Sequence, residues 1–381
     1  MEICMKNNYY MEILKCALNK TSPSKDAVRA ISLSNLYHFA KLNKLIPLFT
    51  TILSYWPVTS KEDEDCITYW KDEATHSVFL EYKKFSLIKQ LCTLAKERNL
   101  SITFFKGYIL ADLYPNFTLR TSSDTDILID SSKLTQLFTL LADLHYSHMS
   151  ELDSEQVYTY VYEEDGYPIH KLEIHTSLFE NMHGAQISYL EELALSSPEK
   201  NISFSCCGIH LETLNHQEHL IYQIFHMIKH FGCHGFPARY LIDVALFIQK
   251  YHTAINWFEL ENIMNTLGYS VFYRQLITIL LNYFDVPKDI FKNMALYSLE
   301  EISDLRDDIL HFGMRSYPDE ISNAFYYFET YIESLECKEN KLLDTITFDG
   351  NTVPVSIVSL HFQENSDLQK RIHLLRNLRI L

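Results

Sequence analysis

Two carboxylates stand one residue apart in this sequence, at Asp124 and Asp126, and the apolar residues Ile127 to Ile129 follow them. This pattern favours a β-strand. Successive side chains of a strand point to opposite faces, so the two carboxylates share one face while Ile127 and Ile129 can enter a core. Mg²⁺, which proteins bind through one or two carboxylates together with substrate phosphates, would relieve the repulsion between the acids. The competing interpretation of an isolated Asp-x-Asp is a pair of solvated acids at a strand end.

The segment upstream of the acid pair has residue types that suit a phosphate group. Ile102 to Phe105 is typical of a short apolar strand, and Lys106-Gly107 then precede residues 108–114, whose apolar side chains have helical spacing. A glycine at this junction lets the backbone approach a phosphate, and the free amides at the start of a helix favour an anion. The junction is therefore a candidate phosphate site.

A polar loop just ahead of the acid pair carries a cation and a hydroxyl, Arg120 and Ser123. An arginine can neutralise a phosphate through two parallel hydrogen bonds, so Arg120 is a candidate contact for an anionic substrate. The alternative is an exposed loop arginine that only improves solubility.

A third acid has a place on a neighbouring strand. Residues 169–175 alternate between apolar and polar types, which places Lys171, Glu173 and His175 on one face. Three carboxylates from two strands could hold a pair of metal ions about 3.5–4 Å apart, which activates an attacking oxygen and stabilises a leaving phosphate. The alternative is that Glu173 and His175 belong to the solvated face of the strand.

The run from Phe104 to Ile129, followed by Leu172 to His175, resembles the uncharacterised nucleotidyltransferase family of the polymerase-beta-like nucleotidyltransferase superfamily. Members show a Lys-Gly, an Arg and an Asp-x-Asp, then an acid-x-His strand. Residues 220–246 also resemble the helical region of that family, so the resemblance covers roughly residues 95–250. It implies transfer of a nucleoside monophosphate from a nucleoside triphosphate to an acceptor, with release of pyrophosphate and with Mg²⁺ or Mn²⁺ as cofactor.

The resemblance also implies roles for individual residues. Asp124, Asp126 and Glu173 correspond to the metal ligands and catalytic acids, with Glu173 as the acid that orients or deprotonates the acceptor. The corresponding nucleotide-binding residues are Lys106, Gly107, Arg120 and Ser123.

The chain departs from the family pattern at Tyr108, where many superfamily members have a serine that contacts the triphosphate. A hydroxyl from Ser122 or Ser123 could replace it, the triphosphate could be held differently, or the scaffold could have lost activity. The last option gives the competing hypothesis, a non-catalytic module that binds a nucleotide or a protein. The intact acids favour an enzyme, because carboxylates gathered without a metal carry an electrostatic penalty.

Histidines crowd one stretch that has helical spacing. His226 and His230 are four residues apart, a spacing that can chelate a transition metal, but zinc hydrolases need a Glu directly after the first His and this chain has Met227. The alternatives are a substrate-facing role and buried structural histidines. Arg239 and Asp243 are also four apart and predict either an internal ion pair or a wall of the nucleotide cleft. The predicted cleft wall comprises His175, His226, His230 and Arg239.

The charge balance limits the partners. The 49 acidic residues outnumber the 33 Lys and Arg residues, for a formal net charge of −16. Proteins that wrap nucleic acid usually present a basic stripe, so extended nucleic acid is not an expected partner. A small molecule, a protein or a peptide is the expected acceptor. No run reaches the ~18 apolar residues that span a bilayer, and no signal peptide is recognisable, so we expect a soluble, cytoplasmic protein without a membrane partner.

The periodicity predicts an α+β fold in which a small mixed β-sheet is flanked by mainly helical N-terminal and C-terminal regions. The expected division is a helical region at 1–98, a nucleotidyltransferase α/β core at 99–210 and a mainly helical region at 211–381. Further expected strands begin near 146, 157 and 169. The expected helices span residues 10–18, 33–49, 74–95, 132–144, 255–267, 272–283 and 319–335. One hairpin is expected at 344–358.

Overall fold

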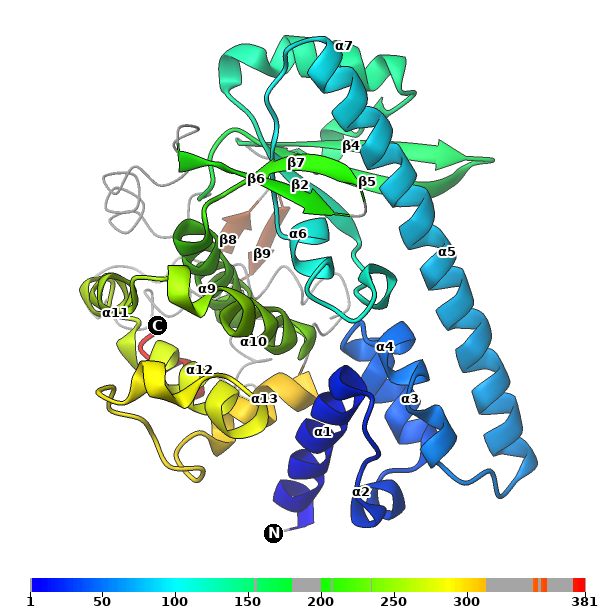
Figure 1. Ribbon diagram of the computed structural model, residues 1–381, viewed down its shortest axis with the longest axis vertical. Coiled ribbons are helices and arrows are strands. Elements are labelled where there is room, and N and C mark those ends of the chain that lie inside the picture. Colours follow the sequence, from blue (N-terminus) through cyan, green and yellow to red (C-terminus); the bar gives the residue numbers. More distant parts are fainter. Residues whose placement is uncertain are drawn as a thin grey trace.

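One mixed sheet forms the centre of the protein (Figure 1), in a computed structural model. The strand order is β3-β4-β5-β2-β1-β7-β6. The structure describes residues 2–153, 156–179, 200–206, 208–233, 235–312, 345–348, 351–354 and 373–380. The strands of the sheet are β1 (Thr103–Phe105), β2 (Asp124–Leu128), β3 (Ser147–His148), β4 (Val157–Glu164), β5 (Tyr167–His175), β6 (Ile202–Cys206) and β7 (Ile209–Thr213).

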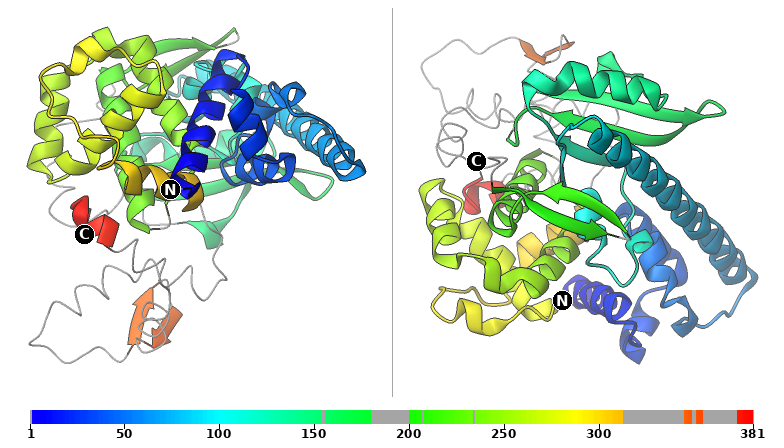
Figure 2. Two further views of the ribbon diagram at one scale, coloured as in Figure 1. Left: turned by 90° about the horizontal axis from the view of Figure 1, so that it is seen from below. Right: turned by 45° about the horizontal axis from the view of Figure 1, so that its top comes forward.

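Helices lie on both sides of the sheet. Figure 1 shows the long helix α5 running past one side of the sheet, with α7 near its upper end and α9 and α10 on the other side. Figure 2 shows α1 beside α13, and residues of these two helices are in contact. The helices are α1 (Glu2–Asn19), α2 (Lys25–Ala30), α3 (Leu33–Leu42), α4 (Ile46–Thr50), α5 (Lys61–Glu97), α6 (Gly107–Ala111), α7 (Leu134–Asp143), α9 (His216–Cys233), α10 (Arg239–Tyr251), α11 (Trp257–Thr266), α12 (Ser270–Tyr283) and α13 (Ser303–Phe312).

The centre of the sheet sets the register of the polar residues. Strand β2 pairs in parallel with β5, so that Asp124 lies opposite Lys171 and Asp126 opposite Glu173. On its other edge β2 pairs antiparallel with β1, where Asp126 lies opposite Phe105. Because side chains alternate along each strand, these polar residues all face one side of the sheet.

The two faces of the sheet pack into two apolar clusters. Ile127 and Ile174 are fully buried with Leu91 of α5 and Leu140 of α7 in one cluster. Phe105 points the other way, into a larger cluster built by α1, α3, α4 and the helices from α9 onward. A sheet cannot bury its own apolar faces, so the helices that pack on each face remove that surface from water. The polar residues of β2 and β5 lie on the same face as Phe105, whose ring contacts Tyr222 of α9.

The predicted α+β architecture, with helical regions before and after a mixed sheet, is confirmed. The predicted strand beside the Asp-x-Asp strand is present as β5, and the two strands run parallel. The predicted hairpin is present as β8 (Thr345–Phe348) and β9 (Asn351–Pro354), which pair antiparallel. The predicted helix at 319–335 lies outside the described residues.

Some elements differ from the prediction. The segment 33–49 forms two helices, because Lys44 adopts a left-handed backbone (φ 56°) between α3 and α4. The segment 108–114 forms only the short helix α6. Strands β6 and β7 were not predicted, and β7 spans residue 210, where the expected core ends. Within the described residues, no helix combines the length and the apolar character needed to cross a membrane.

Candidate active site

A cavity of about 210 Å³ lies between the polar face of the sheet and helices α9 and α10. Its walls come from segments that are far apart in the sequence. The turn between α3 and α4, the junction from β1 to α6, the loop before β2, strands β2 and β5, and helices α9 and α10 all contribute. The chemistry-bearing residues that line it are Lys44, Lys106, Gly107, Arg120, Ser122, Ser123, Asp124, Asp126, Glu173, His175, Tyr222, His226, Lys229, His230, Arg239, Tyr240 and Asp243.

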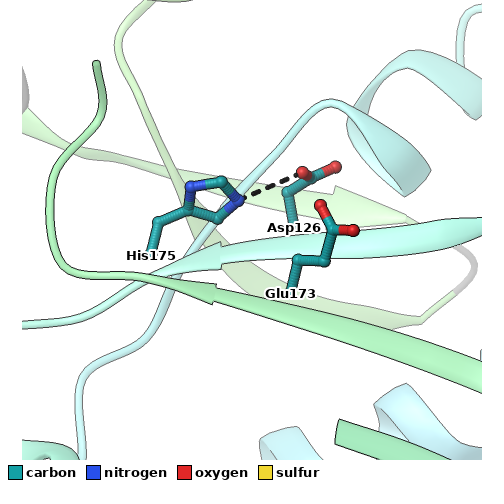
Figure 3. Close-up of side chains that lie close together, drawn as sticks. All are labelled: Asp126, Glu173 and His175. Atoms are coloured by element: carbon teal, nitrogen blue, oxygen red, sulfur yellow. Dashed lines mark ion pairs between the residues drawn. The ribbon is translucent and has the colours of Figure 1, made fainter. Parts of the chain in front are cut away.

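Three side chains from β2 and β5 converge at the floor of this cavity. Asp126, Glu173 and His175 each offer one ligand atom, and these atoms lie within 4.8 Å of one another. Figure 3 shows the His175 ring and the Glu173 carboxylate on either side of Asp126. The His175 Nε2 atom lies 3.3 Å from Asp126 Oδ1. Two carboxylates and an imidazole suit Mn²⁺, and the carboxylates suit Mg²⁺, so this donor set fits a divalent cation.

Asp124 lines the same cavity but does not belong to this close group. It lies two residues before Asp126 on the same face of β2, opposite Lys171, and it is half-buried. The geometry therefore groups Asp126 and Glu173 with His175, which the sequence analysis placed only on the cleft wall. The alternation of residues 169–175 already placed His175 on the face of Glu173.

Lys106 makes a buried ion pair with Asp126. Its Nζ atom lies 2.9 Å from Asp126 Oδ1, and the Asp126 side chain is only 3% exposed. Burial by itself raises the pKa of Asp126, but the Lys106 ammonium, followed by His175, outweighs it and holds this pKa well below its ordinary value. Burial likewise lowers the pKa of Lys106, but Asp126 together with Tyr222, Asp124 and Tyr240 more than offsets that effect, so this pKa is raised. Both groups are therefore charged at neutral pH.

Glu173 also has a lysine partner, Lys171 on the same strand. The Lys171 Nζ atom lies 2.5 Å from Glu173 Oε1, and both side chains are partly exposed. Partial burial lowers the pKa of Lys171, but its hydrogen bond to Glu173 and the negative charges of Glu173, Asp124 and Asp126 together outweigh burial and raise this pKa. Each of the two carboxylates nearest the cavity floor thus carries an ammonium partner.

Arg120 is buried and paired with a residue far along the chain. Its Nε and Nη2 atoms donate to Asp243 Oδ1 and Oδ2 at 2.8 and 2.9 Å, and Tyr114 donates to the same carboxylate at 2.8 Å. The Nη1 atom of Arg120 donates to the carbonyl of Gly107 at 3.2 Å. Arg120 therefore fastens the Lys106-Gly107 junction to α10. The ion pair of Asp243 is formed with Arg120, whereas the sequence analysis considered Arg239.

The backbone at this junction is unusual. Lys106 and Gly107 have φ angles of 58° and 40°, a region that favours glycine. His219 of α9 supports the turn, because its Nε2 atom accepts a hydrogen bond from the Lys106 amide at 3.2 Å. Burial lowers the pKa of His219 to about 3, so the ring is neutral and able to accept.

Tyr108 does not enter the cavity. Its side chain is 5% exposed and belongs to the apolar cluster under α5, where the ring packs on Phe85. The space that a serine hydroxyl would share with a phosphate is therefore not filled by Tyr108. Ser123, the candidate replacement, accepts a 3.4 Å hydrogen bond from Lys44, and Ser122 bonds to the carbonyl of Asp124.

The histidines of α9 serve different purposes. His226 lines the cavity, and its Nε2 atom lies 3.2 Å from the hydroxyl of Tyr240. Burial, and secondarily the charge of Lys106, lowers the pKa of His226 far below its ordinary value, so this ring is neutral. His230 also lines the cavity and packs edge-on against His226. His234 lies outside the described residues.

Several residues of the cavity are not among the predicted site residues. Lys44 lies outside the segments that resemble the family, and Tyr222 and Tyr240 lie within residues 220–246 but are not among the predicted site residues. Their spacing gave no signal, because each reaches the cavity through the packing of helices distant from the acid strands.

Comparison with known proteins agrees with this geometry at the level of family. The sequence model described as "Uncharacterised nucleotidyltransferase" matches residues 30–285, more than half of the chain. No curated protein matches the sequence. One solved structure that matches is the crystal structure of an antigenic nucleotidyltransferase-like protein from Paracoccidioides brasiliensis, at 13% identity and a TM-score of 0.34, over 56% of this chain and 97% of the other.

Proposed function

We propose that this chain, which belongs to the uncharacterised nucleotidyltransferase family, moves a nucleoside monophosphate from a nucleoside triphosphate to an acceptor and releases pyrophosphate. The acceptor we propose is a small molecule, a protein or a peptide. The observation that carries the proposal is the convergence of Asp126, Glu173 and His175 within 4.8 Å, in a cavity that also contains Lys106 and Gly107.

In this proposal the acids of β2 and β5 hold the reacting centre. Asp126 and Glu173, with His175 within reach, hold the cation, and Asp124 contributes from the next position on the same face. A bound divalent cation supplies charge to offset the phosphates and to lower the pKa of the acceptor hydroxyl. The second ion of a two-ion site stays a prediction. Glu173, at the junction of the cavity floor and solvent, orients the acceptor or takes its proton.

The remaining residues position the triphosphate. The Gly107 backbone lines the cavity without a side chain in the way, since nothing lies within 4 Å of where a Cβ would stand. With a cation held at Asp126, the ammonium of Lys106, which now pairs with that carboxylate, would be available to a phosphate oxygen. Arg120 holds the Lys106-Gly107 junction through Gly107, and Ser123 supplies a hydroxyl. The aromatic rings of Tyr222 and Tyr240 line the same cavity.

The second candidate is a non-catalytic module that binds a nucleotide or a protein on the same scaffold. The observation that favours it is that Asp126 and Glu173 already have lysine partners, so the charges of both acids are balanced without a metal ion. The two proposals differ in one measurable respect. Only the enzyme releases pyrophosphate.

The experiment incubates the full chain with each nucleoside triphosphate labelled at the α-phosphate, with Mg²⁺ or Mn²⁺, and with cell extract as the source of acceptors. We expect pyrophosphate release and a labelled product. Asp126→Asn and Glu173→Gln should abolish both. Asp165→Asn, the same change in the turn between β4 and β5, should not.

Circular dichroism shows whether the variants are folded. Glu173→Gln is the safer variant, because Glu173 is only partly buried whereas Asp126 is fully buried. If folded Glu173→Gln and Asp126→Asn release pyrophosphate as fast as the parent, the site assignment is wrong. Nucleotide binding with no release under any of these conditions would favour the second candidate.

A further inference from the structure

Two cations reach the cavity from the helical regions that precede and follow the sheet in the sequence. Lys44 lies in the turn between α3 and α4, and Arg239 is the first residue of α10. The residues that precede them are bonded to each other, because the Ala238 amide donates to Asn43 Oδ1 at 2.6 Å. Asn43 and Ala238 are both fully buried. This single contact fixes Lys44 and Arg239 beside one another although they are 195 positions apart in the sequence.

Both cations are also fixed to the loop that leads into the acid strand. Arg239 Nη1 donates to the carbonyl of Thr121, and Lys44 Nζ donates to Ser123 Oγ at 3.4 Å. The Thr121 hydroxyl donates back to the carbonyl of Lys44 at 3.2 Å. The two positive charges therefore stand at the residues immediately before Asp124.

The positive charges of Lys44 and Arg239 are not neutralised by ion pairs within the described residues. Lys106 is paired with Asp126, and Arg120 is paired with Asp243. Among the described residues, no carboxylate forms an ion pair with Lys44 or Arg239. Arg239 is only 5% exposed, and its Nε atom is buried without a hydrogen-bond partner in the described part of the chain. A buried guanidinium that lacks a counter-ion is costly, so the arrangement calls for an anionic ligand.

The pKa of Lys44 also reflects the unbalanced positive charge. Burial, and then the charge of Arg239, lowers the pKa of Lys44 to about 8. The neighbouring Asp124 acts in the opposite direction without cancelling that effect. An anion between the two cations would relieve their repulsion.

We infer that Lys44 and Arg239 form a subsite for a diphosphate group, the terminal β- and γ-phosphates of the nucleoside triphosphate. This inference rests on the proposed function. An arginine fork and a nearby ammonium match the oxygens of a diphosphate, which carries more charge in a small volume than any other part of the substrate. The position ahead of Asp124 leaves the acids Asp126 and Glu173 to the reacting α-phosphate. Lys44 and Arg239 thus select triphosphates over monophosphates.

The test measures binding of inorganic pyrophosphate, inorganic phosphate and adenosine monophosphate to the full chain by calorimetry, with chelator and no divalent ion. We expect pyrophosphate to bind most tightly. Lys44→Met and Arg239→Met should each weaken it about tenfold or more, the loss typical of one charged hydrogen-bond partner. Lys44→Arg should retain most of the affinity. Lys41→Met is the matched control, because Lys41 lies on α3 and is exposed, and it pairs with Glu73 away from the cavity.

Arg239→Met removes a buried group and could unfold the chain, so Arg239→Lys provides a second variant that keeps the charge and loses the fork. It should fall between the parent and Arg239→Met. Equal pyrophosphate binding by the parent and by folded Lys44→Met would overturn the inference. So would phosphate or the monophosphate binding as tightly as pyrophosphate, or no pyrophosphate binding at all. Pyrophosphate binding that depends on Lys44 in a chain that transfers no nucleotide would refute the proposed function and leave the subsite standing.

Discussion

Replacing Lys106 by methionine removes the ammonium that holds Asp126. The two charged atoms are 2.9 Å apart, so their attraction is about 6 kcal/mol at an effective dielectric constant of about 20. The cost of removing both charges from water offsets part of this, and breaking a buried pair from one side commonly costs about 3–5 kcal/mol. His175, at 3.3 Å from the same oxygen, remains as a weaker partner. We therefore expect Lys106→Met to lower the free energy of unfolding by about 3 kcal/mol.

The same substitution should strengthen metal binding. In the parent, a cation must compete with the Lys106 ammonium for Asp126 Oδ1, whereas in Lys106→Met this oxygen is available. We expect the Kd for Mn²⁺, measured by calorimetry without nucleotide, to fall about tenfold, which corresponds to about 1.4 kcal/mol. Saturating Mn²⁺ should then restore much of the lost stability, by about 2.7 kcal/mol at a concentration 100 times its Kd.

The matched control is Lys171→Met, which removes the ammonium from the partly exposed Glu173. Because solvent screens that pair, the free energy of unfolding should change by less than about 1 kcal/mol. Urea unfolding of the parent and both variants, with and without Mn²⁺, gives all of these quantities. A loss of stability no greater for Lys106→Met than for Lys171→Met, or an unchanged Kd for Mn²⁺, would refute the reasoning that Lys106 occupies the place of a cation.

Two further predictions concern the cavity and its border. The affinity for a triphosphate should fall as pH rises through about 8, because Lys44 loses its proton there while Arg239 keeps its charge. Calorimetry at several pH values should show this fall in the parent and a constant affinity in Lys44→Arg. The same dependence of affinity on pH in parent and variant would exclude Lys44 as the titrating group. The charged groups that face Lys44 are Arg239, Asp124, Arg120 and Lys84. Tyr108→Phe should preserve stability or raise it by about 1 kcal/mol, since the Tyr108 hydroxyl is buried without a partner among the described residues. Tyr108→Ser should cost about 3–5 kcal/mol of stability, because it opens a void beside Phe85. Equal thermal stability of the serine and phenylalanine variants would contradict this packing.

The acid strands could be predicted because their signal is local. The alternation of residues 169–175 and the Asp-x-Asp of β2 fixed which side chains share a face, and the structure has both strands with those faces. Strands β6 and β7 were missed although residues 202–213 alternate in the same way around Gly208, whose φ of 82° marks the turn. The alternation on either side of Gly208 is therefore a local signal for this hairpin.

The partners of the charged residues could not be predicted, because they are set by packing over long separations in the chain. Spacing along one helix suggested an ion pair between Arg239 and Asp243, but Asp243 pairs with Arg120, 123 positions away. Lys44 resembles any exposed lysine in a helix-to-helix turn until α10 is packed against it. The catalytic and binding roles of the individual site residues stay predictions.

The bond between Asn43 and Ala238 has a consequence for dividing the chain. The acids belong to the sheet, whereas Lys44 and Arg239 are brought together only when the helices before and after the sheet close on each other. A fragment limited to the strands and α7 would keep the oxygens that attract a cation and lose both charges that attract a polyanion. The proposed metal site and the proposed site for the phosphate tail therefore depend on different parts of the fold, and the second needs the helices that precede and follow the sheet.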